Sequence, residues 1–168
     1  MAAPNCKILV FPDAPRAILR IIGRATASAA PDFLALLQRL KSQGFECFVF
    51  ELSECVLMDS TVVGHLAQLA LRQAEVNPSG KANILLVNPG EHITTLLDTI
   101  FVLDLFEVMH GENLAQSDSA AEETQCQSRS REEVNRCCLE AHKALAALAP
   151  ENAAKFQDVI RFLEAEAK

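Results

Sequence analysis

Asp59, Ser60 and Thr61 stand where an apolar segment gives way to helical spacing, and their side chains can bind backbone groups or carry a phosphate. The preceding segment, Cys47 to Leu52, is rich in β-branched and aromatic residues, which predicts a strand buried on both faces. An oxygen of Asp59 or Ser60 can cap the following helix by accepting a hydrogen bond from its first turn, and capping alone accounts for these residues. A phosphate would also be stabilised there, because the helix dipole and free N–H groups favour negative charge.

The sequence has no motif of a nucleotide-binding, hydrolytic or metal-binding site. Neither common glycine-rich phosphate loop occurs, and no serine lies in a Gly-x-Ser-x-Gly elbow. The four histidines do not form a metal-binding pair with an intervening glutamate: His65, His92, His110 and His142. We therefore expect neither an enzyme nor a bound metal or cofactor.

Six cysteines are present without the paired spacing of a metal site: Cys6, Cys47, Cys55, Cys126, Cys137 and Cys138. Free thiols are the default in a reducing compartment, and a buried thiol behaves as a small apolar side chain. The adjacent pair Cys137 and Cys138 leaves open a vicinal disulfide or a soft-metal site, although neighbouring side chains on a helix point about 100° apart. We favour free thiols.

Composition and charge restrict the class of partner. The chain has 168 residues, half of them hydrophobic, which suits a globular domain with an appendage. Its net charge of -7, with no cluster of Lys or Arg, disfavours nucleic acid and anionic membranes. No apolar run is long enough to insert in a membrane, and the first residues lack the order of a secretory signal, so we expect a cytoplasmic protein.

Strands and helices alternate along the first two thirds of the chain. The pattern predicts strands at 6–11, 17–22, 47–52, 84–87 and 105–109, and helices from Pro31 to Gly44, after Ser60, and after Asn88. The first two strands form a hairpin, because the turn-forming residues 12–15 separate them. The later strands must pair in parallel through helical crossovers. The expected fold is an α/β mixed sheet covered by helices.

The last third of the chain differs in character. We predict a linker over residues 113–130, which are polar, between a domain at 1–112 and a helical hairpin at 131–168 that is broken near Pro150. Ser119 with Glu122 and Ser130 with Glu133 both match a capping box, so the hairpin has two candidate starts. Its apolar residues, spaced four and three apart, suit packing on the domain or self-association into a homodimer.

The residues from Leu52 to Gly64 resemble the signature of STAS domains, whose pattern there is Met-Asp-Ser-[Ser/Thr]-Gly-Leu-Gly. Leu96 to Val108 is similar to the last helix and strand of that family, and the resemblance covers about residues 6–110. It implies a STAS-like fold, which is the fold of bacterial anti-sigma factor antagonists. These are non-enzymatic proteins of signal transduction and transcription regulation.

The resemblance also implies a site and its partners. The serine after the aspartate, here Ser60, would be the phosphoacceptor, with Thr61 as the alternative. The partner would be an anti-sigma factor or a serine/threonine kinase of the histidine-kinase-like ATPase fold. The residues expected to contact it are Asp59, Thr61, Val62, Val63, Gly64 and Thr26.

The sequence departs from the family pattern at three places. Val62 and Val63 replace a glycine and a leucine, Thr26 stands in place of an acidic residue, and Phe101 stands where a glycine is common. Two other functions therefore stay open. One is an unphosphorylated scaffold or oligomerisation protein, and the other is a lipid-transport accessory protein of the same fold.

Overall fold

A mixed sheet forms the centre of the computed structural model, which describes residues 5–111, 122–127 and 129–168. Its strands are β1 (Cys6–Asp13), β2 (Arg16–Ala25), β3 (Cys47–Glu51), β4 (Cys55–Met58), β5 (Ile84–Val87), β6 (Glu107–Met109) and β7 (Glu122–Gln125). The order is β6-β5-β3-β2-β1-β7, and β4 pairs with the second half of β2. β1 is antiparallel to β2 and β7, whereas the pairs among β2, β3, β4, β5 and β6 are parallel. The predicted α/β fold with an N-terminal hairpin is confirmed.

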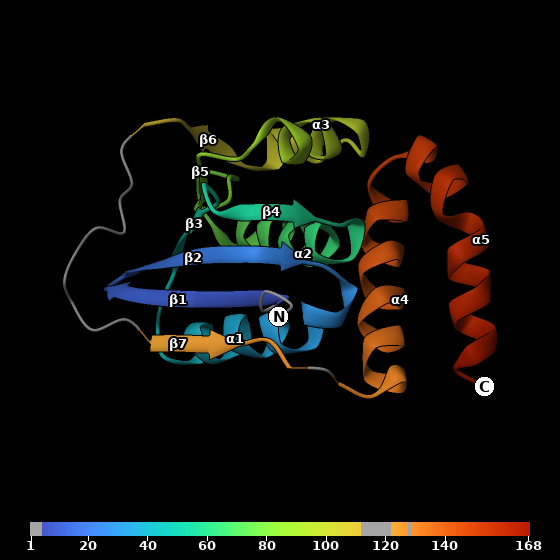
Figure 1. Cartoon of the computed structure of the whole chain (residues 1–168). Coiled ribbons are helices and arrows are strands. Elements are labelled where there is room, and N and C mark those ends of the chain that lie inside the picture. The colour runs from blue at the N-terminus through green and yellow to red at the C-terminus, as the bar shows by residue number, and fades with distance from the viewer. Residues whose placement is uncertain (1–4, 112–121, 128) are drawn as a thin grey trace.

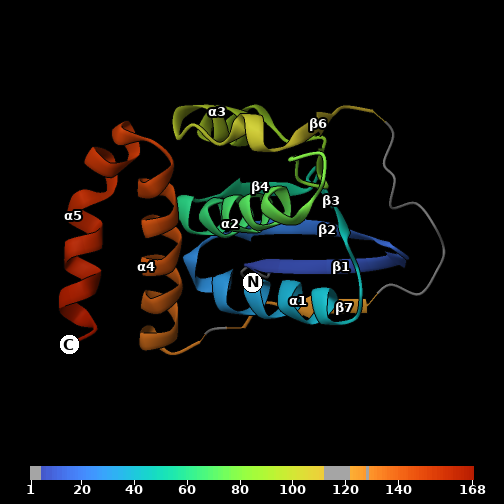
Figure 2. The ribbon, with the colours of Figure 1, turned by 180° about the vertical axis from the view of Figure 1, so that it is seen from behind.

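The helices are α1 (Ala30–Ser42), α2 (Ser60–Val76), α3 (Glu91–Thr99), α4 (Arg131–Leu148) and α5 (Pro150–Glu166), with 3₁₀ turns η1 (Ala27–Ala29) and η2 (Leu103–Leu105). Figure 2 shows α1 and α2 side by side on one face of the sheet. The helices α1, α2 and α3 follow β2, β4 and β5, so all three begin at the edge where the parallel strands end. Both views place α4 across this edge and α5 outside α4 (Figures 1 and 2).

The core lies between the sheet and α1 and α2. Along β1, β2, β3 and β5, successive side chains point to opposite faces of the sheet. Those on one face, which include Phe48 and Phe50, pack against α1, where the ring of Phe33 meets that of Phe50. Fully burying each such side chain stabilises the fold by about 1.5–3 kcal/mol. Leu145 of α4 and Phe156 of α5 belong to the same apolar cluster. The hairpin therefore packs on the domain through its own apolar residues.

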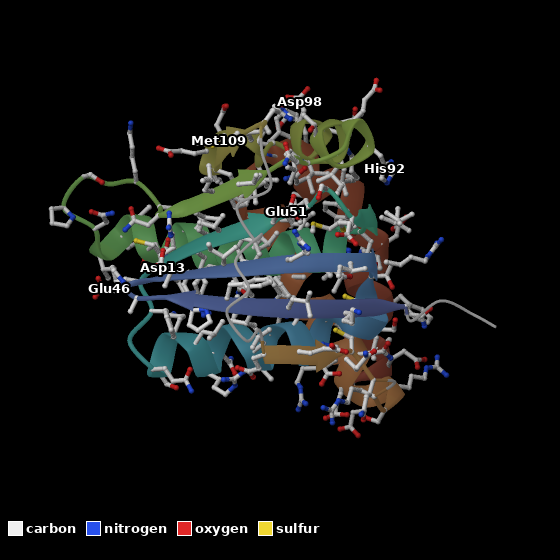
Figure 3. The ribbon with its side chains drawn as sticks, turned by 60° about the vertical axis from the view of Figure 1, so that its left-hand side comes forward. Asp13, Glu46, Glu51, His92, Asp98 and Met109 are labelled. Atoms are coloured by element: carbon white, nitrogen blue, oxygen red, sulfur yellow. The ribbon has the colours of Figure 1, made fainter. Side chains whose placement is uncertain are left out.

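The other set of alternating side chains forms the second face of the sheet. A smaller apolar cluster there contains Phe11, Ile18, Val49 and Val87. Glu51 is fully buried on this face, near its centre in Figure 3, and its Oε2 lies 3.4 Å from Nε of Arg20. The pair keeps the carboxylate from being buried without a counter-charge.

Several elements differ from the predicted ones. β4 was not predicted, because four residues between two loops give too little periodicity. The last parallel strand is shorter than predicted, since η2 occupies residues up to Leu105. Part of the predicted linker forms β7, whose polar sequence Glu-Glu-Thr-Gln has no apolar alternation and becomes a strand by pairing with the free edge of β1.

The start of the C-terminal hairpin agrees with one of the two predicted capping boxes. Ser130 caps α4, and its side chain and that of Glu133 exchange bonds with each other's backbone N–H groups. The alternative, Ser119, lies outside the described residues. In the part of the chain that the structure describes, no helix combines the length and apolar character needed to cross a bilayer.

Candidate functional site

Asp59 fixes the start of α2. Its Oδ1 accepts hydrogen bonds from the N–H groups of Thr61 (3.1 Å) and Val62 (3.2 Å), so Asp59 rather than Ser60 is the N-cap. Its Oδ2 accepts a bond from the N–H of Ala27 at 2.8 Å. This second bond ties the loop after β2, which contains Thr26, to the start of α2. The carboxylate thus leaves the Ser60 hydroxyl available for another contact.

That contact comes from α4. Oγ of Ser60 lies 2.9 Å from Nε2 of His142, and Nδ1 of His142 lies 2.7 Å from the carbonyl oxygen of Cys138. A carbonyl only accepts, so Nδ1 carries the proton, and in the neutral ring Nε2 is the acceptor for the Ser60 hydroxyl. The ring of His142 also packs on Phe156 of α5, with ring centres 5.0 Å apart. Both helices of the hairpin therefore hold the histidine on Ser60.

A serine bonded to an oriented histidine is also an arrangement used by hydrolases, but the surroundings do not suit catalysis. The N–H groups of Thr61 and Val62, which could stabilise an oxyanion, are already bound by Asp59. Neither Ser60 nor His142 lines any of five pockets on the described part of the chain. The pair is a contact between two helices.

Two further polar contacts join α2 and α4. The hydroxyl of Thr61 lies 3.5 Å from Sγ of Cys138, and Nε2 of the buried His65 donates to the carbonyl oxygen of Cys137 at 3.0 Å. Burial lowers the pKa of His65, while the bond to the Cys137 carbonyl opposes that shift. The interface therefore holds His65 neutral.

The adjacent cysteines, Cys137 and Cys138, lie in the same interface between α2 and α4. Burial raises the pKa of Cys137 to about 11 and also raises the pKa of Cys138. Both are free thiols on consecutive positions of α4. Among the described residues no group of three or more metal-binding side chains occurs, here or elsewhere.

Gly64 is the point of closest approach between the two helices. A Cβ atom on Gly64 would lie 2.7 Å from both Cβ and the carbonyl oxygen of Ala141. Real Cβ atoms do not come so close to a backbone, so any side chain at this position would force α4 away from α2. Gly64 is therefore the position of α2 against which the backbone of α4 packs.

Other residues anchor the two ends of the hairpin. Asn152 is fully buried, and its Nδ2 donates to the carbonyl oxygens of Ile100 (2.8 Å) and Leu145 (3.0 Å). Before α4, the carboxylate of Asp32 on α1 accepts bonds from the N–H of Gln127 (2.7 Å) and from Nε of Arg129 (2.9 Å). The hairpin is thus fastened beside α3 and beside α1.

The predicted site residues fall into two groups. Asp59, Ser60, Thr61, Gly64 and Thr26 lie together at the start of α2 or in the loop bonded to it. Thr61 and Gly64 are buried beside α4, and Val62 and Val63 are completely buried in the apolar core. The reason is helical geometry, since both occupy the face of α2 that also carries Leu66 and Ala67.

Sequence reasoning missed the groups that meet this site from the C-terminal third. His142, Ala141 and Asn152 carry no local signal, because each acts on a residue far away in the sequence. A small residue on the apolar stripe of α4, opposite a small residue of α2, is the signal that indicates a close helix crossing.

No family model and no curated protein matches the chain. Among solved structures, the chain is similar to the anti-sigma factor antagonist SpoIIAA in its unphosphorylated form, with a TM-score of 0.49 and 16% identity. The match covers 60% of this chain and 86% of that chain. It is a likeness of fold alone.

Proposed function

We propose that the chain is a non-enzymatic regulatory binding protein, with the start of α2 as its protein-binding surface and Ser60 as its phosphoacceptor. The observation that carries the proposal is that a helix already binds this surface. Ala141 of α4 packs on Gly64, and His142 of α4 is hydrogen-bonded to Ser60. In this proposal the α4–α5 hairpin is an internal ligand of the surface. An external partner must displace it.

Phosphorylation of Ser60 and docking of α4 exclude each other in this proposal. The 2.9 Å between Ser60 Oγ and His142 Nε2 leaves no room for a phosphoryl group. Phosphorylation also replaces the hydroxyl hydrogen that Ser60 donates to Nε2 of His142, so this hydrogen bond is lost. Asp59 adds like-charge repulsion beside it. Once α4 has left, the dipole of α2 favours a phosphate at this helix start, while the N–H groups of Thr61 and Val62 stay bound to Asp59.

The kind of partner follows from what α4 presents. A competitor for this surface carries a helix with a small residue where Ala141 lies, because Gly64 admits only a close-packed backbone. An anti-sigma factor, or a serine/threonine kinase of the histidine-kinase-like ATPase fold, is the partner class that the sequence pattern implies. A homodimer through the apolar residues Leu145 and Phe156 requires the hairpin to leave its own domain first, since both are buried against it.

Phosphosite mapping tests the proposal directly. The full chain is incubated with ATP and a serine/threonine kinase encoded beside its gene, and modified peptides are identified by mass spectrometry. We expect phosphate on Ser60, none on Ser60→Ala, and unchanged modification of Thr61→Ala. Modification of Thr61 instead, or of a serine on another surface, would refute the assignment of Ser60.

A further inference from the structure

Three cysteines lie in one row across the sheet. Cys126 continues the β1–β7 register by one residue, so it lies opposite Cys6, and its N–H donates to the Cys6 carbonyl oxygen at 3.0 Å. Cys6 in turn lies opposite Gly23 of β2, and Gly23 lies opposite Cys55 of β4. Directly opposite residues point to the same face of a sheet, so the thiols of Cys6 and Cys126 are neighbours.

Strand geometry decides which of these thiols can join. Residues that form a hydrogen-bonded antiparallel pair have Cα atoms about 5.5 Å apart, within the range of about 4.4–6.8 Å found in disulfides. Cys55 is two strands from Cys6, roughly 10 Å away, which is too far for a bond. Closing the bond between Cys6 and Cys126 draws their Cβ atoms together by about 1 Å, which the short edge strand β7 can allow.

The two thiols differ in access. Cys6 is buried, whereas Cys126 is half-buried and lines a small pocket of about 40 Å³ with Asn5 and Ser28. A pocket of this size admits a molecule as small as water or peroxide. The side chain of Cys6 lowers the pKa of Cys126, while the same contact raises the pKa of Cys6. Cys126 is therefore the more accessible of the two thiols and the one that loses its proton more readily.

We propose that Cys6 and Cys126 form a reversible redox site whose oxidant is a hydroperoxide such as hydrogen peroxide. The Cys126 thiol loses its proton, and the resulting thiolate attacks one peroxide oxygen. The O–O bond breaks, the leaving hydroxide takes up that proton to form water, and Cys126 becomes a sulfenic acid. The Cys6 sulfur then attacks the Cys126 sulfur, and the S–O bond breaks. The hydroxyl leaves with the Cys6 proton as water. Two thiols and one peroxide thus yield one disulfide and two waters, with the dithiol oxidised and the peroxide reduced.

The bond would fasten the base of the hairpin. Gln127 and Arg129, directly after Cys126, are already held by Asp32 of α1, and Ser130 then starts α4. A disulfide to β1 keeps this segment on the sheet even when β7 frays. If the proposed function holds, oxidation therefore favours the form in which α4 covers Ser60. The disulfide itself does not depend on that function.

Peptide mapping of the intact chain tests the site without any kinase. The purified protein is titrated with hydrogen peroxide, remaining thiols are blocked with N-ethylmaleimide, and the digest is searched for cross-linked peptides. We expect an intrachain Cys6–Cys126 link to appear first and to disappear with dithiothreitol. Cys126→Ser should abolish it, and the matched variant Cys47→Ser should retain it. Hydrogen exchange of Glu122–Gln125 should slow by roughly tenfold or more in the oxidised form.

Other outcomes overturn the proposal. Oxidation of Cys126 to sulfinic acid without the link would show that Cys6 does not reach it. Links that join two chains, or that use Cys47 or Cys138 first, would show that the paired register does not direct the chemistry. Because no phosphorylation is measured, a failure of Ser60 as phosphoacceptor would leave this result unchanged, and the two proposals fail separately.

Discussion

His65 shows how one buried side chain makes the α2–α4 contact sensitive to pH. Burial lowers its pKa in the folded chain, whereas an unfolded histidine titrates near 6.5. The unfolded chain therefore binds the proton more readily, so the stability that depends on neutral His65 is complete above about pH 6.5 and is lost as the pH falls below it. The slope from one such group reaches at most about 1.4 kcal/mol per pH unit.

We predict that His65→Gln flattens the loss of unfolding free energy between pH 7 and pH 5, since an amide can donate to the Cys137 carbonyl without titrating. Urea unfolding at each pH measures the slope. The control is His92→Gln on α3, which lies at the rim of the molecule in Figure 3 and is exposed. Equal slopes for His65→Gln and the parent chain would contradict the prediction.

The chemistry at Ser60 was only half visible in the sequence. Asp59 and Ser60 are adjacent, and their order before a helical pattern indicates both a cap and a phosphate site. His142 bonds to Ser60 from 82 positions away, and nothing in the local pattern of either segment indicates that contact. Local chemistry could be predicted because its rules act over a few residues. The tertiary partner depends on how the hairpin folds back.

At the scale of the elements, the crossing of α2 and α4 depends on Gly64. Alanine in place of a helical glycine ordinarily adds about 1 kcal/mol of stability. Here we predict the opposite sign for Gly64→Ala, a loss of about 1–3 kcal/mol, because the new Cβ overlaps the backbone of Ala141. Hydrogen exchange should rise along α4, residues 131–148, more than along α1.

The control for this substitution is Gly90→Ala, at the start of α3, where a Cβ meets no atom within 4 Å. Its unfolding free energy in urea should stay within about 0.5 kcal/mol of the parent chain. If Gly64→Ala proved as stable as this control and α4 kept its protection, the close helix crossing would be wrong.

The end of α3 provides a second prediction at this scale. Phe101 has a φ of 60°, the left-handed conformation that usually follows a helix at glycine, and its side chain is 53% exposed. That conformation costs a non-glycine residue about 1–2 kcal/mol. Glycine avoids this cost but loses about 0.5–1 kcal/mol more conformational entropy on folding. We predict that Phe101→Gly raises the unfolding free energy by up to about 1 kcal/mol and that Phe101→Val lowers it.

Urea unfolding compares these two variants with the parent chain. If Phe101→Gly lost as much unfolding free energy as Phe101→Val, the prediction would be wrong. The contacts of the exposed ring would then stabilise the fold by more than the backbone strain at this position destabilises it. In the family that the sequence resembles, glycine is common at this position. The positive φ of Phe101 gives a physical reason, because glycine adopts this conformation without strain.

Elements with strong periodicity were predictable, and weakly patterned ones were not. β3 and α2 follow from continuous apolar runs and from helical spacing. β4 and β7 have four residues each, and β7 is polar throughout, so only the neighbouring strand edge makes them strands. Pairing with an existing edge is a long-range effect that a short segment does not encode.

At the scale of the whole molecule, the C-terminal hairpin covers the edge of the sheet where α1, α2 and α3 begin (Figure 1). In open α/β sheets this edge is the usual place for binding. The four-three spacing of the hairpin predicted an apolar seam but not its partner, because the same seam suits a domain face or a second helix pair. Leu145, Phe156 and the buried Asn152 show that it is used within the chain.

In the proposed function, α4 and a phosphate on Ser60 compete for the start of α2. The most direct test is hydrogen exchange of the full chain carrying phosphoserine at position 60, installed during synthesis by an expanded genetic code, against the unmodified chain. We expect faster exchange throughout residues 131–148 and 150–166 of the phosphorylated chain, with β3 and α1 unchanged. Full protection of α4 in the phosphorylated chain would contradict it.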